Sequence, residues 1–331
     1  MIVFLPIKIA PTGGTSSFAK KIQAGLRKHG HEVIFEYQKK YDVLLASPSA
    51  PLKYLLDAKH RHKKIIHRLD GVYYPTSVAG WLYPLHNARL ALTRNFFADT
   101  IIYQSVYSQK SCERFLGKTS KPAVTIYNGV DTNHFSPQGS KVNLRDTPDQ
   151  HVFITVSRFR RSDQIVPLIE SFNKYQKTQH ANSKLVIIGN FIGAVQDIPK
   201  QHANNPSLQF LNIVPNGQLP SYLRAADAFL FTHLNPPCPN NVLEAMACGL
   251  PICGIADGAM PELVTSGVHG ELIPATSDGF YKTRVSNKTA FVQNMVRVIE
   301  KKNLFAANCV QRVQEEFNLE KMVKNYLNVL P

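Results

Sequence analysis

The chain has 331 residues, 44% of them hydrophobic, and a formal net charge of +15. This length suits two domains of about 150 residues each. No apolar run approaches the ~18 residues that a membrane-spanning helix needs, so the totals favour a globular protein and argue against a membrane-spanning one.

The positive charge is concentrated in the first part of the chain. Residues 1–140 hold 19 Lys and Arg against 8 Asp and Glu. Such an excess suits a nucleic acid, an anionic membrane surface or an anionic substrate, and a solvated basic face is the simpler alternative. The sequence contains no RNA-binding aromatic strand, zinc-finger spacing or helix-turn-helix pattern, so we expect no nucleic-acid partner.

The start of the chain and the cysteines indicate the compartment. The first ten residues, MIVFLPIKIA, lack the charged segment and cleavage site of a signal peptide and are expected to form a strand that leads into a loop. The five cysteines form no CxxC pair, and this odd, scattered set predicts reduced thiols in a cytosolic protein. Core packing explains them better than metal binding, and no metal site is expected.

The first forty residues predict a strand, a glycine loop, a helix and a second strand. The expected strands are 2–5 and 32–37, and the helix runs over 16–28 with apolar residues on one side. Gly13 and Gly14 in the loop would let backbone N–H groups approach a phosphate or a sugar. The loop matches neither the GxGxxG nor the Walker pattern, and a tight turn that requires glycine is an equally good explanation.

Another strand, 64–69, ends at Asp70. Residues that follow a parallel strand lie in the crevice of an open α/β sheet. Asp70 is therefore a candidate site residue, while His67 is more simply explained as a core histidine. The densest basic run, 59–64, precedes this strand and reads either as a solvated loop or as a contact for an anionic acceptor or lipid headgroups.

A polar segment at 137–150 is the expected linker, and a buried strand at 151–156 then begins the second half. Arg158 and Arg161 follow this strand. The planar guanidinium group matches phosphate oxygens, so both are candidates for a diphosphate clamp. The alternative is a solvated basic turn.

The stretch from Asn235 to Val264 carries the strongest pattern. Asn241 is expected to cap a short helix with Glu244 at the capping-box position, and Gly249 and Pro251 are expected to end the helix. A helix N-terminus attracts phosphate, and a carboxylate in the first turn suits ribose or sugar hydroxyls. Together these features predict a nucleotide-sugar site.

This stretch resembles a known family. LEAMACGLPI followed by PELV is similar to the donor-binding segment of GT-B glycosyltransferases of family 4 (glycosyl transferases group 1), and NGVD at 128–131 is similar to their interdomain junction. The resemblance implies an α/β fold of two Rossmann-like domains that face each other across a cleft. The implied parts are an acceptor-binding domain (1–138), a nucleotide-sugar-binding domain (139–315) and a terminal helix (316–331) that packs back on the first domain.

The resemblance also implies roles for individual residues. Arg158 matches the family arginine, and Arg161 replaces a lysine for which the sequence has no clean counterpart. Glu244 matches the second of two family glutamates and would bind the ribose. The remaining donor-binding residues implied are Gly13, Gly14, Val214 near the base, and the backbone of Asn240 and Asn241. Pro236 occupies the position of the first glutamate, a departure that removes the acidic contact to the donor sugar.

The implied function is a retaining, metal-independent hexosyltransferase without a cofactor or a dedicated general base. It would move a sugar from a UDP- or GDP-sugar to a hydroxyl of a glycan, a lipid-linked glycan or a polysaccharide. The expected location is the cytoplasm, with peripheral contact between the basic first domain and the inner membrane face. Three alternatives remain: an impaired nucleotide-sugar-binding homologue, a nucleotide-sugar epimerase of the same fold, and a basic membrane-surface protein without catalysis.

Overall fold

The computed structural model describes residues 1–10, 13–48, 50–77, 80–276, 279–281 and 287–331. The chain forms two compact units, residues 1–129 with 317–331 and residues 130–316. The chain therefore passes from the first unit to the second between residues 129 and 130, whereas the expected domain boundary was residue 138. The segment expected as a linker belongs to the second unit, where the Arg224 guanidinium group donates hydrogen bonds to the carbonyl oxygens of Ser136 and Ser140.

The first unit is built on a parallel sheet of six strands in the order β2-β1-β3-β4-β5-β6. Parallel neighbours need crossover connections, and helices supply them. The strands are β1 (Ile2–Phe4), β2 (Glu32–Ile34), β3 (Val43–Ala46), β4 (Lys64–Leu69), β5 (Thr100–Tyr103) and β6 (Ala123–Thr125). The helices are α1 (Gly14–Lys28), α2 (Leu52–His60), η1 (Gly80–Leu82), α3 (Tyr83–Leu92), the π-helical turn η2 (Thr93–Phe97), α4 (Val106–Leu116) and α12 (Leu319–Leu327).

The helices of the first unit divide between the two faces of this sheet. Residues of α1 and α12 share a buried cluster with Val3, Leu45 and Ile66. Helices α2, α3 and α4 pack on the opposite face, against Ile65 and Ile101. This layering follows from the two-residue period of a strand, which sends successive side chains to opposite faces.

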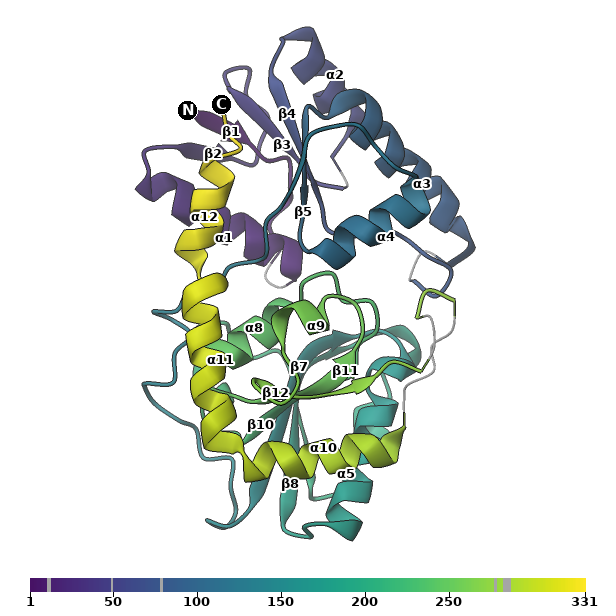
Figure 1. Ribbon diagram of the computed structural model, residues 1–331, viewed down its shortest axis with the longest axis vertical. Coiled ribbons are helices and arrows are strands. Elements are labelled where there is room, and N and C mark those ends of the chain that lie inside the picture. Colours follow the sequence, from purple (N-terminus) through teal and green to yellow (C-terminus); the bar gives the residue numbers. More distant parts are fainter. Residues whose placement is uncertain (11–12, 49, 78–79, 277–278, 282–286) are drawn as a thin grey trace. The chain divides into compact units, whose positions relative to one another are not determined.

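The terminal helix α12 lies beside α1 (Figure 1). A Cβ atom on Gly25 of α1 would lie 2.2 Å from a methyl group of Val323. Only glycine at this position lets the two helices come so close. The family resemblance led us to expect a terminal helix here, and in the structure α12 completes the core of the first unit.

The second unit contains another parallel six-stranded sheet, in the order β12-β11-β10-β7-β8-β9. Its strands are β7 (His151–Phe159), β8 (Ser183–Phe191), β9 (Leu208–Leu211), β10 (Ala228–Phe231), β11 (Ile252–Ala256) and β12 (Gly270–Pro274). Its helices are η3 (Ser162–Gln164), α5 (Val166–Thr178), η4 (Gly193–Val195), α6 (Ile198–Gln201), α7 (Leu219–Leu223), α8 (Asn240–Ala247), α9 (Met260–Leu263), α10 (Lys288–Glu300) and α11 (Lys302–Glu316).

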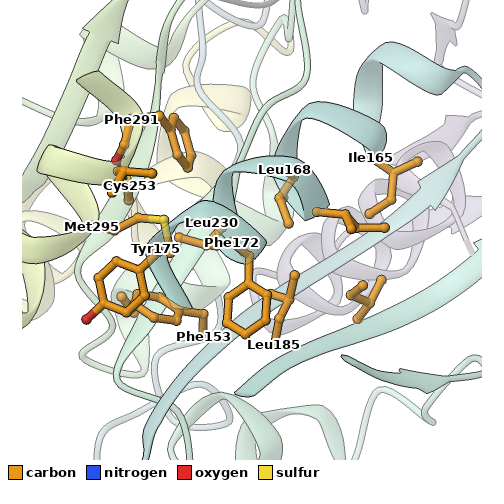
Figure 2. Packing of buried hydrophobic residues seen from close by; sticks show 14 of the residues in the cluster. Phe153, Ile165, Leu168, Phe172, Tyr175, Leu185, Leu230, Cys253, Phe291 and Met295 are labelled. Atoms are coloured by element: carbon orange, nitrogen blue, oxygen red, sulfur yellow. Dashed lines mark hydrogen bonds between the residues drawn. The ribbon is translucent and has the colours of Figure 1, made fainter. Parts of the chain in front are cut away.

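One large core cluster of the second unit lies between its sheet and helices α5 and α10. Phe153, Leu185 and Leu230 from the strands meet Phe172 of α5 and Met295 of α10, as Figure 2 shows. Aromatic and branched side chains of this size supply most of the apolar surface that folding removes from water. None of the helices within the described residues is long and apolar enough to cross a membrane.

Candidate functional site

The candidate donor site lies at the carboxyl edge of the second sheet. From β7 the chain moves outward through β8 and β9, and it returns on the other side of β7 through β10, β11 and β12. The strand order therefore reverses between β7 and β10. In open α/β sheets, ligands bind at such a switch point, outside the carboxyl ends of the strands.

The loops that follow β10 and β11 at this edge are joined by two hydrogen bonds. The N–H of Asn235, after β10, donates to the Asp257 carboxylate at 2.6 Å, and the N–H of Ala259, after β11, donates to the Pro236 carbonyl oxygen at 2.8 Å. A Cβ atom on Gly258 would lie 2.3 Å from the Pro236 ring. Buried Pro236, at the position of the missing family glutamate, is therefore part of the packing between the two loops.

The start of α8 differs from the sequence prediction. The helix begins at Asn240, its N-cap residue is Pro239, and no side chain caps it. Asn241 is the second helical residue, and its amide instead donates to the Val156 carbonyl oxygen at 2.6 Å. Pro239 has an extended backbone that cannot continue a helix backwards, so the helix starts directly after it.

This shift also corrects the predicted place of Glu244. Glu244 is the fifth residue of α8, so it lies neither in the first turn nor at a capping-box position. Its side chain is buried, with 8% of the residue exposed. Glu244 therefore has no capping role, which leaves a binding or packing role for its carboxylate.

The C-terminus of α8 follows the prediction. Gly249 has a φ of 77°, its N–H donates to the Met246 carbonyl, and the N–H of Leu250 donates to the Ala245 carbonyl. These two bonds form a Schellman motif with glycine at C′. The chain can then turn at once into strand β11, which pairs with β10 and β12.

Arg158 and Arg161 lie at the end of β7 but in different surroundings. The strand continues to Phe159, three residues beyond the predicted end, so Arg158 is a strand residue with an exposed side chain. Arg161 forms a two-pronged ion pair with the buried carboxylate of Asp163, at 3.0 and 2.8 Å. This pair fixes the Arg161 guanidinium group and offsets part of its charge.

No sequence pattern pointed to His233, which follows β10 at the same edge. Its ring stacks on Phe231 at 5.0 Å and lies edge-on to Phe159 at 5.9 Å. Its Nε2 atom is enclosed and has no hydrogen-bond partner among the described residues. Burial, together with the nearby Arg161 charge, lowers the pKa of His233 from 6.5 to about 4, so the ring is neutral at pH 7.

The first-unit candidates lie at the carboxyl edge of the first sheet. Gly13, with a φ of 115°, is the N-cap of α1, and Gly14 is its first residue. A side chain would be strained at that φ, so glycine is required there. The residues before it in the predicted loop, 11–12, lie outside the described residues.

Asp70 follows β4 and forms an ion pair with Arg68. Arg68 is itself buried, and its Nε and Nη2 donate to Tyr326 Oη at 3.0 Å and to Asn128 Oδ1 at 3.1 Å. Its guanidinium group also lies 3.7 Å from the centre of the Phe18 ring. Asp70 is thus held by a network that reaches α1 and α12.

His67 is a core histidine. It is fully buried, and both ring nitrogens have no hydrogen-bond partner in the part of the chain that the structure describes. Burial and the Arg94 charge lower the pKa of His67 from 6.5 to about 3. A neutral, enclosed imidazole on the face covered by α3 and α4 is not available to a substrate.

Val214 follows β9, the outermost strand on one side of the second sheet, and is partly buried. The structure thus places Arg158, Arg161, Asn240, Asn241 and Val214 in or after strands at one edge of this sheet, with Glu244 one turn further into α8. A cavity of about 480 Å³ in the same unit is lined by residues such as Ala226 and Leu250, which precede β10 and β11. It therefore lies at the amino edge and is not the candidate donor site.

No three His, Cys, Asp or Glu side chains of the described residues come together in a group that could hold a metal ion. The metal independence of the reaction stays a prediction. The predicted substrate, a nucleotide sugar, would be held by arginine side chains and helix N–H groups.

Comparisons with known proteins agree with this geometry. Residues 140–286 match the sequence profile of the family "Glycosyl transferases group 1". The chain is 24% identical over 220 residues to N-acetyl-alpha-D-glucosaminyl L-malate synthase of Bacillus anthracis, which covers 64% of this chain and 54% of that protein. It is 26% identical over 211 residues to the UDP-Gal:alpha-D-GlcNAc-diphosphoundecaprenol alpha-1,3-galactosyltransferase of Escherichia coli, covering 60% of this chain and 51% of that protein.

These matches span about half the length of the two relatives. Among solved structures, HepE of Anabaena in complex with UDP-glucose superposes with a TM-score of 0.76 at 16% identity, over 99% of this chain and 98% of that one. At this identity the likeness shows the fold alone. Residues 140–286 are thus similar to the glycosyl transferases group 1 family, and the two six-stranded parallel sheets of the chain have the GT-B fold.

Proposed function

We propose that this protein is a retaining glycosyltransferase that moves a hexosyl group from a nucleotide diphosphate sugar to a hydroxyl acceptor. The observation that carries the proposal is the convergence of Arg158, Arg161 and the N-terminus of α8 at the switch point of the family-matched unit. A diphosphate bound there would meet two guanidinium groups and the first N–H groups of a helix, which have no intrahelical partner.

The charges of the site suit the departure of a diphosphate. During transfer, the bond between the sugar's anomeric carbon and the diphosphate oxygen breaks, and negative charge grows on that oxygen. Arg158, Arg161 and the positive end of α8 would stabilise this charge. Strand pairing fixes the backbone that carries Arg158, and the Arg161–Asp163 ion pair holds the Arg161 guanidinium group. The acceptor oxygen bonds to the same face of the sugar, and its proton passes to the departing diphosphate.

The remaining donor contacts follow from the loops. Glu244 would accept hydrogen bonds from the ribose hydroxyls, and Val214 would contact the base. Because Pro236 is used in packing against Gly258, the sugar contact has to come from another group. Asn240, the first residue of α8 and only partly buried, is the group that we propose, with Asn235 beside it.

Within the first unit, Gly13, Gly14 and Asp70 are the proposed binding groups. The N-terminus of α1 presents backbone N–H groups beside a glycine that leaves room for a ligand, and Asp70 carries a carboxylate at the same sheet edge. We propose an acceptor hydroxyl on a lipid-linked glycan or a polysaccharide. The name of the Escherichia coli relative, which specifies a diphosphoundecaprenol acceptor, supports this class.

We further propose a cytoplasmic protein that associates with the inner membrane face, since the first 140 residues carry the larger share of the net charge. A panel of UDP-, GDP- and ADP-sugars, assayed for nucleoside diphosphate release with and without lipid-linked and polysaccharide acceptors, tests the activity. We expect release that depends on one donor and on an acceptor. Tight nucleotide binding without turnover would indicate an impaired homologue, and product formed without an acceptor would indicate an epimerase.

A further inference from the structure

A row of large apolar side chains is exposed along the helical run from Gly80 to Phe97, which comprises η1, α3 and η2. Trp81 is 85% exposed, Leu85 68%, Leu92 42% and Phe96 72%. Their spacings of four, seven and four residues place them on one face of the run. The opposite face carries the buried residues Asn87, Leu90 and Arg94. The run thus has a buried face that packs on the first unit and, opposite to it, an exposed face that is also apolar.

Helix α2 adds to the same surface. Leu52 is 48% exposed and Leu56 54%, one turn apart, whereas Leu55 and Ala58 pack inward on the sheet. Helix α2 contacts η2, and both cover the same face of the first sheet. We call the six exposed side chains the apolar face: Leu52, Leu56, Trp81, Leu85, Leu92 and Phe96. Single exposed apolar residues are ordinary, but a group on neighbouring helices marks an interaction site.

The border of the apolar face is basic. Lys53 and His60 are exposed on α2 beside Leu52 and Leu56, and Lys59 is also exposed there but pairs with the Asp99 carboxylate at 2.9 Å. The run from Gly80 to Phe97 contains no Asp or Glu. The Asp57 carboxylate on α2 is paired with Arg61, so it does not change the sign of this border.

We propose that the apolar face docks on an anionic membrane surface, with Trp81, Leu85, Leu92 and Phe96 in the boundary between headgroups and acyl chains and Lys53 at the lipid phosphates. Tryptophan, phenylalanine and leucine beside lysines are the composition of helices that lie in a membrane interface, and tryptophan favours the headgroup level. The proposed function supplies the reason for docking, a lipid-linked acceptor, but the docking itself does not depend on it.

The test uses Trp81, the single tryptophan of the chain. Its fluorescence reports on this face alone. We expect the emission to shift to shorter wavelength when vesicles of equal parts phosphatidylcholine and phosphatidylglycerol are added, and to be quenched by brominated acyl chains. Phosphatidylcholine vesicles alone should give a smaller shift, since they lack the charge. An emission maximum that stays unchanged with the anionic vesicles would overturn the proposal.

Flotation of variants with vesicles separates the contributions of apolar side chains and of charge to membrane binding. Leu85→Ser with Phe96→Ser should weaken partitioning onto the anionic vesicles at least about tenfold, and Lys53→Gln should weaken it only at low salt. The matched control is Leu304→Ser, which removes a leucine 59% exposed on α11 and should float like the wild type. Equal flotation of the apolar variant and the control contradicts the proposal.

Two further measurements distinguish membrane docking from self-association and from the proposed activity. A blue shift that rises with protein concentration in the absence of vesicles means that a second copy covers the face, which overturns the membrane assignment. Nucleoside diphosphate release with a water-soluble acceptor should be the same in the Leu85→Ser/Phe96→Ser variant and in the wild type. If no donor is turned over but Trp81 still responds to vesicles, the proposed activity fails and the docking face stands.

Discussion

The side-chain amide of Asn241 donates a 2.6 Å hydrogen bond to the carbonyl oxygen of Val156. The bond joins the start of α8 to β7 across 85 residues of sequence. It therefore sets the position of the helix N-terminus relative to the strand that carries Arg158. Both groups are proposed to hold the diphosphate, so this contact, together with the packing of α8 on β10, β11 and α11, helps to set the spacing between them.

Replacing Asn241 by alanine should lower the free energy of unfolding by about 1–3 kcal/mol, because the Val156 carbonyl loses its partner at a part-buried position. It should also weaken donor binding. Urea unfolding and donor titration measure the two effects. Asn240→Ala is the matched control for stability, since it removes an amide one residue away and should change the unfolding free energy by less than about 0.5 kcal/mol. Equal stability of the two variants would show that the Asn241 bond is unimportant.

Glu244→Ala should weaken donor binding by about 1–3 kcal/mol, the cost of losing a charged hydrogen-bond partner. Since Glu244 is not a helix cap, its loss should not act through the helix start. Calorimetric titration with the nucleoside diphosphate identified by the donor panel measures the change, and Glu244→Gln keeps the shape of the side chain as a control. A loss of stability with unchanged affinity would mean that the carboxylate serves only packing.

Arg158 and Arg161 should respond differently to mutation. Arg158→Ala should lower kcat/KM about 10²–10³-fold, because the exposed guanidinium group would act on the charge of the transition state. Arg161→Ala should lower it less and should also cost about 1–3 kcal/mol of stability, because buried Asp163 loses its ion-pair partner. Asp163→Asn tests this pairing from the other side. A greater loss of activity in Arg161→Ala than in Arg158→Ala would reverse the assignment.

The sequence was a good guide where the deciding interactions are local. Gly249 was predicted as the C′ residue because glycine reaches a positive φ without strain and a proline follows two residues later, and both conditions act within one turn. The alternation of strands and helices was likewise readable from apolar runs. The family resemblance added the GT-B fold, which local patterns alone do not specify.

The sequence predictions were wrong where contacts with residues distant in the sequence determine the local structure. Asn241 has the composition of an N-cap, but its amide bonds to Val156, and the proline before Asn240 sets the start of the helix. Strand β7 was predicted to end at Val156, but pairing with β8 extends it to Phe159, whose ring stacks on Phe191 at 4.8 Å. A position in the sequence does not reveal such partners, so His233 was missed for the same reason.

His67 gives the stability a defined pH dependence. Its pKa is about 3 in the folded chain and ~6.5 in an unfolded one. Below pH ~6.5 the His67 ring binds a proton in the unfolded chain but stays neutral in the folded chain. The free energy of unfolding therefore decreases as the pH falls from ~6.5 towards about 3. The slope for one such group is about 1.4 kcal/mol per pH unit.

The variant His67→Leu removes this titration. We expect the difference in unfolding free energy between pH 7.5 and pH 5 to be about 2 kcal/mol smaller in the variant than in the wild type. Urea unfolding at both pH values measures it. His233, with a pKa of about 4, contributes in the same direction in both proteins and cancels in the comparison. The same pH dependence in variant and wild type would mean that His67 is protonated in the folded chain.

A substitution at Pro236 tests whether the lack of an acidic residue at this position weakens the proposed activity. Pro236 is buried, its carbonyl oxygen accepts from the N–H of Ala259, and its ring fills the space above Gly258. A glutamate there would place a carboxylate and an extra N–H in this packed position. Pro236→Glu should therefore cost about 1–3 kcal/mol of stability and should not raise turnover. Urea unfolding and the donor assay measure both, with Pro237→Glu, at a partly exposed neighbour, as the control. If Pro236→Glu raised turnover above the wild type, the acidic sugar contact would be the missing element and the natural protein would be the impaired homologue.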